Sequence, residues 1–313
     1  MTTSMNTQPS LRYCGRDFTA DDLDTIRRIT DDPHQPTRAE IARAVCDALA
    51  WTGPDGAPKL MSCRVALQRM EAHGVIWLPL PTRETARPRP PAFTPDSDPK
   101  PPLAMPLGQL GPVHLELVQT STAGRLWNEY IARYHYRGAI VLPGAQLRYL
   151  AYTQERQVVA AFGLGAAAWK LAPRDRFIGW TAAEREAHLS AVVDLHRFLI
   201  LPWVRVPHLA SHLLGQLARR LPSDWRERYA VSLAMLETFV ESDRFPGTSY
   251  AAANWLRVGQ TQGRGRGDRT RQRSETIKDI WLLPLVPDFR HILTATRLPP
   301  QGRRHTGRAG AGR

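Results

Sequence analysis

The chain has 313 residues, of which 42% are hydrophobic and 23% are charged, so a folded core is feasible and wholesale disorder is excluded. Its longest charge-free apolar run, residues 158–169, is too short to cross a bilayer, and we expect no membrane contact. The first residues carry no secretory leader pattern. Three cysteines without a C-x-x-C spacing favour a reducing, cytoplasmic location over a disulfide scaffold.

The formal net charge is +13, and the excess is concentrated at one end of the chain. Residues 256–313 hold 13 basic and 4 acidic residues, whereas residues 1–100 hold 13 of each. A basic tail of this kind indicates a polyanionic partner, most often DNA or another nucleic acid. Two alternatives remain open: a GC-rich genome that favours arginine codons, and a tail that only improves solubility.

Residues 11–78 predict a winged-helix-like module that binds DNA. Thr19 can cap a first helix, and the TRAE pattern from Thr37 to Glu40 is a capping box for a second. A third helix is expected over residues 62–73, followed by a strand, VIWLPL, at residues 75–80. The outward face of the third helix would carry Arg64, Gln68 and Arg69, residue types that bind base edges. A small helical bundle without DNA contacts is the alternative, favoured by the near-zero net charge of this part.

A proline-rich linker is expected over residues 79–112, which hold 11 of the 26 prolines. It separates the module from a mixed α/β domain over residues 113–290, and a basic, disordered tail is expected over residues 291–313. The fold class predicted for the whole chain is α+β.

The larger domain is predicted to alternate strands and helices. Strands are expected at residues 147–153, 158–169, 196–202, 233–241 and 278–285, and helices at residues 181–193, 207–220 and 247–259. This order resembles the GNAT acetyltransferase fold. In that family a helix start with the pattern Arg/Gln-x-x-Gly-x-Gly/Ala binds the coenzyme A pyrophosphate. Here the corresponding stretch, RVPHLA at residues 205–210, has His208 at the glycine position, so the resemblance implies the architecture and acetyl-CoA is not expected as a cofactor.

A second resemblance covers nearly the whole chain and rests on a series of sequence motifs. These are YHYRG (134–138), GAQLRY (144–149), FGLGAAAW (162–169), LAPRDR (171–176), RFLILP (197–202), LETFV (236–240), GTSY (247–250), ANW (253–255) and GRGR (263–266). They resemble the Druantia protein A (DruA) family of bacterial anti-phage systems and transposase-like mobile elements. The resemblance implies a role in anti-phage defence or element mobility. The chain departs from the family pattern in two places. Asp194 and His196 stand where asparagine and serine are expected, and Glu241 stands where aspartate is expected.

Five residues are candidates for chemistry. Glu237 and Glu241 lie on the same face of one strand and Asp243 follows it, so the three carboxylates could hold Mg²⁺ for phosphoryl transfer. The alternative is that Glu237 pairs with an arginine and that the other two carboxylates are solvated. His135 is a candidate general acid or base, and Tyr250 is a candidate nucleophile or acid; hydrogen-bonded structural roles are the alternatives.

Further residues are expected to contact DNA. Arg197 begins an apolar strand and can pair with phosphate or with Glu237, and Asn254 and Trp255 can bind a base or instead cap and pack a short helix. A glycine-rich loop offers backbone donors beside a set of arginines: Arg264, Arg266, Arg269, Arg271 and Arg273. No Walker A loop, zinc-ligand spacing or G-x-S-x-G motif is present in the sequence.

Three functions follow from these observations. The first is a DruA-type DNA-binding protein that cuts or joins strands with Mg²⁺. The second is a non-catalytic DNA-binding subunit that recruits a helicase or nuclease. The third is an acyltransferase that uses acetyl-CoA.

Overall fold

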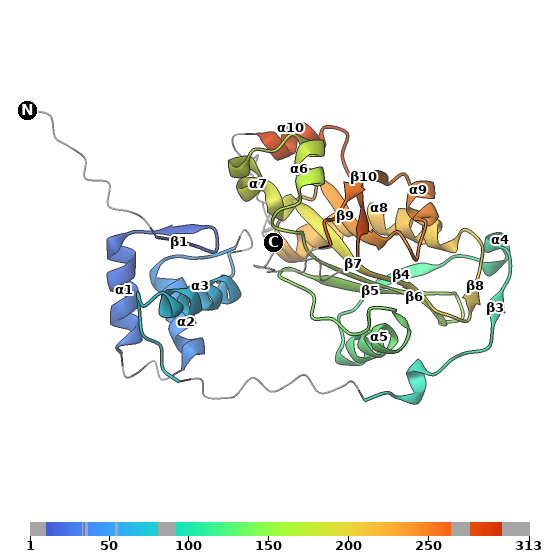
Figure 1. Ribbon diagram of the computed structural model, residues 1–313. Helices are drawn as coiled ribbons and strands as arrows, with labels where there is room; N and C mark the ends of the chain where they lie inside the picture. The colour runs from blue at the N-terminus through green and yellow to red at the C-terminus, as the bar shows by residue number, and fades with distance from the viewer. Residues whose placement is uncertain are drawn as a thin grey trace, which may run out of the picture. The chain divides into compact units, whose positions relative to one another are not determined.

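The computed structural model describes residues 11–32, 34, 37–53, 56–80, 92–263 and 276–295 (Figure 1). The chain divides into two compact units, Met1–Pro90 and Pro91–Arg313. Among the described residues, no helix combines the length and the apolar composition that a membrane span requires.

The first unit is a β-hairpin followed by three helices. Its elements are β1 (Leu11–Tyr13), β2 (Arg16–Phe18), α1 (Ala20–Thr30), α2 (Arg38–Ala48) and α3 (Leu60–Ala72). Cys14 and Gly15 both adopt positive φ angles, 50° and 78°, which is the backbone of a tight two-residue hairpin turn. Thr19 caps α1 and Thr37 forms a capping box, both as predicted, and Thr19 proves to form a capping box as well. Ile26, Ile41 and Met70 lie in the core that joins the three helices.

The predicted strand at residues 75–80 is wrong. These residues form no strand, and only Ile76 is buried, whereas Trp77 and Leu80 are 85% and 87% exposed. An apolar run becomes a strand only when a partner strand is available, and within the described residues none lies beside this segment. The helices therefore match the prediction, but the wing of a winged helix is not formed here.

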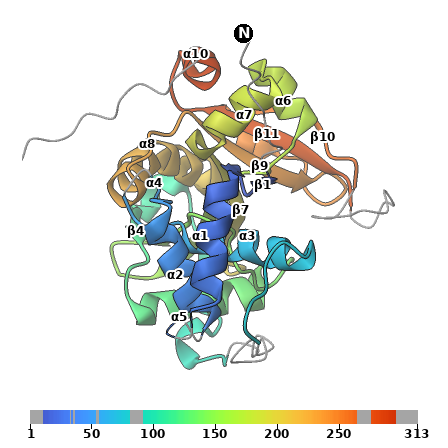
Figure 2. The same ribbon diagram turned by 90° about the vertical axis from the view of Figure 1, so that its left-hand side faces the viewer.

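The second unit is a mixed α/β domain built on a seven-stranded sheet (Figures 1 and 2). Its sheet strands are β4 (His114–Leu117), β5 (Leu147–Tyr152), β6 (Val158–Ala166), β7 (Val192–Ile200), β9 (Met235–Glu241), β10 (Leu256–Gln260) and β11 (Lys278–Pro284). Their order is β10-β11-β9-β7-β6-β5-β4. All neighbours are antiparallel except β7 and β9, which run parallel.

Helices flank this sheet, and short elements connect its strands. They are η1 (Pro95–Ser97), β3 (Leu103–Ala104), α4 (Leu107–Leu110), α5 (Ser121–Tyr134), α6 (Ala172–Ile178), α7 (Ala182–His188), η2 (Leu189–Ala191), β8 (Val204–Arg205), α8 (Leu209–Tyr229), α9 (Thr248–Ala252) and α10 (Phe289–Thr294). Arg148 of β5 stacks on Trp127 of α5, while its neighbour Tyr149 donates to Asp224 of α8. Because successive strand residues point to opposite faces, α5 and α8 cover opposite faces of the sheet.

Several predicted boundaries need correction. The expected linker ends early, because residues 92–112 pack on the second unit: Glu129 of α5 accepts from the backbone N–H and the hydroxyl of Thr94, and β3 pairs with β8. The helix expected over residues 247–259 stops at Ala252, and β10 follows it. The expected tail begins inside α10, and its residues 296–313 lie outside the described part of the chain.

Candidate functional site

The strands β7 and β9 part in the middle of the sheet and leave a cleft between them. They pair only from Val192 to Asp194 and from Met235 to Glu237. Beyond this point both strands line a cavity of about 520 Å³, together with residues 134–137 at the end of α5 and residues 244–250 around the start of α9. A parallel pair that separates in this way exposes strand edges, and side chains and ligands can fill the gap.

A β-bulge shapes the β7 wall of this cleft. Gly163 pairs with Arg197 and Leu164 pairs with Leu195, so His196 is the extra residue. Its ring Nδ1 lies 3.0 Å from Asp194 Oδ2, and its Nε2 lies 3.3 Å from the carbonyl oxygen of Ala166. The ring also occupies the space above Gly165, where a Cβ would come within 2.9 Å of it. The bulge thus places Asp194 and His196 side by side on the cleft wall.

The cleft carries an excess of positive charge. Arg137, Arg197 and Arg244 line it, and Asp194 is the one carboxylate among the described lining residues. Arg197 is buried, and its guanidinium donates to the backbone carbonyls of Gly138 and His196. Burial and the neighbouring Arg137 lower the pKa of Arg197. Since carbonyl oxygens carry no net charge, these bonds orient the guanidinium without neutralising it, and an anion entering the cleft meets a fixed cation.

His135 lies in the cleft as a neutral ring. Burial, with Arg197, Arg137 and Arg244 nearby, lowers its pKa to about 4. Its Nδ1 accepts the backbone N–H of Arg137 at 3.2 Å, which assigns the proton of the neutral ring to Nε2. A side chain with this pKa is a weak base at neutral pH, so the predicted role as general acid or base loses its main support.

Tyr250 also lines the cleft, on α9. Burial raises the pKa of its hydroxyl, and a hydrogen bond with Thr238 opposes this effect. Its ring packs against Trp255 and Trp281, with centroid distances of 5.4 and 6.2 Å. A neutral, packed phenol is a poor nucleophile. Trp255 is itself 3% exposed, so the prediction that it stacks on a base is wrong, and the alternative of packing the short helix describes it better.

The three candidate metal ligands do not come together. Glu237 is fully buried and pairs with Arg174, with 2.8 Å between Oε2 and Nη1, while its Oε1 accepts the backbone N–H of Ala168 at 2.7 Å. Glu241 is half-buried and Asp243 is exposed. Within the described residues no cluster of three or more His, Cys, Asp or Glu side chains suits a metal ion. The proposed Mg²⁺ set therefore does not fit, and Glu237 has the ion-paired role given as its alternative.

Burial also governs the ionisation of Glu237. It raises the pKa of this carboxyl, and Arg174 and the Ala168 N–H oppose the rise. Arg174 extends the network because it also donates to Asp175, which in turn contacts Arg185. The network ties α6 and α7 to β9.

The expected DNA contacts are spread over both units. In the first unit Arg64, Gln68 and Arg69 are exposed on α3, as the prediction requires, and the neighbouring Glu71 is held by Arg38. In the second unit Asn254 is exposed in a left-handed conformation, φ 63°. The arginines of the glycine-rich loop, Arg264, Arg266, Arg269, Arg271 and Arg273, lie outside the described residues.

The sequence analysis missed four residues of the cleft: Tyr136, Arg137, Arg244 and Phe245. Tyr136 and Arg137 belong to the YHYRG motif, and Arg244 and Phe245 lie in the loop that follows β9. Position at the end of a central strand is the one signal that could have identified Arg244 and Phe245.

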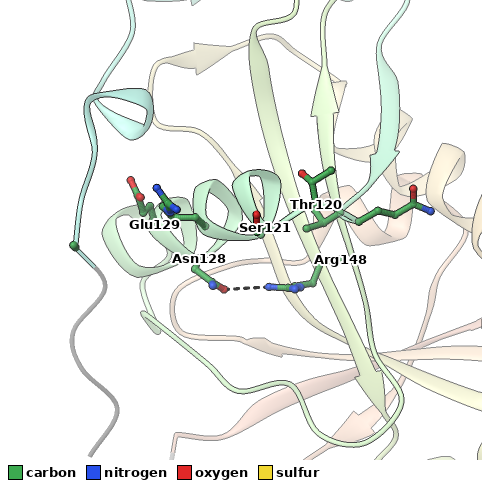
Figure 3. A pocket seen from close by; sticks show the side chains of 10 residues that line it. Thr120, Ser121, Asn128, Glu129 and Arg148 are labelled. Atoms are coloured by element: carbon green, nitrogen blue, oxygen red, sulfur yellow. Dashed lines mark hydrogen bonds between the residues drawn. The ribbon is translucent and has the colours of Figure 1, made fainter.

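A second hollow of about 610 Å³ lies at the N-terminal end of α5 (Figure 3). Arg148 points along its floor and donates to Asn128 at 3.3 Å, while Glu129 lies at its edge and binds Thr94. It contains none of the predicted site residues, whereas the cleft contains His135, Arg197 and Tyr250. The cleft is therefore the stronger candidate.

Comparisons with known proteins place the chain in one family. No curated protein matches it. Among solved structures, a putative phosphinothricin N-acetyltransferase is similar at 13% identity and a TM-score of 0.37, over 56% of this chain and 99% of that one. Spermidine N-acetyltransferase from Vibrio cholerae, in complex with CoA and spermine, is similar at 9% identity and a TM-score of 0.37, over 55% and 95%. An N-acetyltransferase from Staphylococcus aureus Mu50 is similar at 7% identity and a TM-score of 0.33, over 56% and 99%.

At these identities and TM-scores the likenesses say nothing about substrate or activity. The family model described as Druantia protein DruA matches residues 83–278, which is more than half of the chain and includes every residue that lines the cleft. The chain therefore belongs to the Druantia protein DruA family.

Proposed function

We propose that the chain is a DNA-binding protein of Druantia-type anti-phage defence, and that the cleft between β7 and β9 binds a phosphate group of the nucleic acid. The observation that carries this proposal is the charge of the cleft: three arginines face one carboxylate. Arginine is well suited to phosphate because its planar guanidinium offers paired donors. The net charge of +13 supports the same partner, because it attracts a polyanion from a distance.

DNA cleavage by this chain has less support than DNA binding. Glu237, the leading candidate for catalysis, is occupied by Arg174, and Tyr250 and His135 are neutral side chains in packed surroundings. We therefore favour the function in which the chain binds DNA and recruits a helicase or nuclease that performs the cleavage. A role in element mobility would use the same binding surface.

The test is a DNA-binding titration of the full chain by fluorescence anisotropy at several salt concentrations. Arg244 is exposed, so Arg244→Ala removes a charge from the cleft without opening the core. We expect it to weaken binding and to reduce the slope of log K against log salt by about 1. Arg226→Ala is the matched control, because Arg226 is exposed in the last turn of α8, far from the end that borders the cleft. Equal effects of the two substitutions would remove the cleft from the proposal.

An acetyl-CoA-dependent acyltransferase is the second candidate function. One observation favours it: His208, which stands where the coenzyme A pattern has glycine, adopts a left-handed conformation with φ 65° directly before α8. This is a conformation that glycine adopts without strain, so the backbone at this position is one that a glycine would favour. Calorimetric titration with acetyl-CoA tests this candidate, and no heat at millimolar ligand would exclude it.

A further inference from the structure

The cleft carries a group of packed rings beside its arginines. His135 stacks on Tyr136 with 4.8 Å between centroids, and Tyr136 lies 5.3 Å from Phe245. The guanidinium of Arg244 lies over both, 4.7 Å from the Tyr136 centroid and 5.6 Å from the Phe245 centroid. All four residues line the cavity. Phe245 is 41% exposed, so its ring is accessible to a ligand.

These rings and arginines are arranged as a nucleotide would require. A nucleotide has a flat, aromatic base and an anionic phosphate. Aromatic side chains bind the first by stacking, and arginines bind the second. The cleft offers the exposed ring of Phe245 for a base, and Arg137 and Arg197 for a phosphate, whereas His135 and Arg244 already pack on Tyr136. Neither set alone defines the ligand, because exposed rings also bind peptides and arginines also bind carboxylates; the combination within one cavity favours a nucleotide.

The size of the cleft decides which form of DNA can enter. A cavity of 520 Å³ lies in the range of about 300–1,000 Å³ that holds one small ligand. A double helix, whose major groove alone is about 12 Å wide, cannot enter such a space, and a paired base presents only its edge. A base in a single strand presents both of its faces.

We infer that the cleft between β7 and β9 binds one unpaired nucleotide of single-stranded DNA, with its base against Phe245 and its phosphate at Arg137 and Arg197. This inference rests on the proposed DNA binding and deepens it. It identifies the substrate class as a single strand, the form of DNA that a helicase or nuclease partner produces or acts on.

The experiment compares single- and double-stranded oligonucleotides of one sequence, binding to the full chain and to three variants. Phe245→Ala removes the exposed ring, and Phe245→Trp replaces it with a larger one that can still stack. Phe93→Ala is the matched control, because Phe93 is also exposed, 54%, and also carries an arginine, Arg133, over its ring, 5.1 Å away. Anisotropy gives the affinities, and 2-aminopurine in the single strand reports stacking by its fluorescence.

We expect the single strand to bind more tightly than the duplex. Phe245→Ala should weaken single-strand binding by about five- to a hundredfold, the range for removal of one base–aromatic stack, and leave duplex binding unchanged. Phe245→Trp should retain single-strand binding, Phe93→Ala should bind as the wild type, and 2-aminopurine should be quenched in a manner that depends on Phe245.

The outcomes separate the two proposals. If Phe245→Ala binds the single strand as well as the wild type does, the nucleotide site is overturned while DNA binding stands. If single strand and duplex bind equally and lose affinity equally with Phe245→Ala, the preference for an unpaired base is overturned. If neither DNA binds at low salt, the proposed function fails and this inference fails with it.

Discussion

His135 shows how a single side chain reports the charge of its surroundings. Its ring is partly buried among three guanidinium groups, so protonating it would add a fourth positive charge to a crowded site. A native pKa of about 4 lies below the 6.5 of the unfolded chain. The contribution of His135 to stability is therefore present above pH 6.5 and is lost as the pH falls toward 4.

We expect the wild type to lose more stability than His135→Asn when the pH falls from 7.5 to 4.5. Asparagine keeps an acceptor for the Arg137 N–H but does not titrate. The full shift would correspond to about 3 kcal/mol, which we reduce to about 1–2 kcal/mol because solvent screens a partly exposed ring. Urea unfolding at both pH values gives the difference. Parallel pH profiles for the two proteins would show that the His135 ring is not held neutral by its neighbours.

The loops and helices around β9 depend on one buried ion pair. Arg174 of α6 and Glu237 of β9 are both fully buried, and their charges compensate each other. Removing one partner leaves the other as an uncompensated charge in the core, although Asp175 continues to contact Arg174. This arrangement explains why a carboxylate sits inside the otherwise apolar sequence MLETFV.

We expect Glu237→Gln to lower the free energy of unfolding by about 3 kcal/mol, because it leaves Arg174 partly unpaired. The double variant Arg174→Met with Glu237→Leu should recover most of this loss, since neither charge remains. Denaturant unfolding of the wild type, Arg174→Met, Glu237→Leu and the double variant completes the cycle, and Glu237→Gln is measured beside them. A Glu237→Gln protein as stable as the wild type would mean that Glu237 is held neutral and that the pair contributes little.

Local sequence patterns predicted the capped helices of the first unit because capping is a property of neighbouring residues: Thr19 caps α1, and Thr37 forms the expected capping box. The helix α5 was not predicted, although Thr120 caps it. The glycines in the strands did not predict their neighbours in this way. Gly163 makes room for Trp127, because an added Cβ would come within 2.7 Å of that ring. Such a contact joins residues far apart in the sequence. The cleft depends on similar long-range contacts, because it exists only where β7 and β9 part.

The two units of the chain carry two different candidate surfaces for DNA. The second unit has a cleft suited to one unpaired nucleotide, and the first has a helix, α3, whose exposed face carries Arg64, Gln68 and Arg69. The sequence predicts that this helix enters the major groove of a duplex, where arginine and glutamine bind base edges and phosphates. The prediction for α3 therefore concerns duplex DNA, whereas the inference for the cleft concerns a single strand.

This division of roles predicts that substitutions in α3 act on duplex binding alone. In Arg64→Ala with Arg69→Ala we expect at least a tenfold loss of duplex affinity and a salt slope reduced by about 2, with single-strand binding unchanged, because the cleft is intact. Arg28→Ala with Arg43→Ala is the control, since both residues are exposed on α1 and α2 and the net charge falls equally. If the control pair weakens duplex binding as much, the effect comes from overall charge. The outward face of α3 would then have no special part in duplex binding, and the small helical bundle would be the correct description of the first unit.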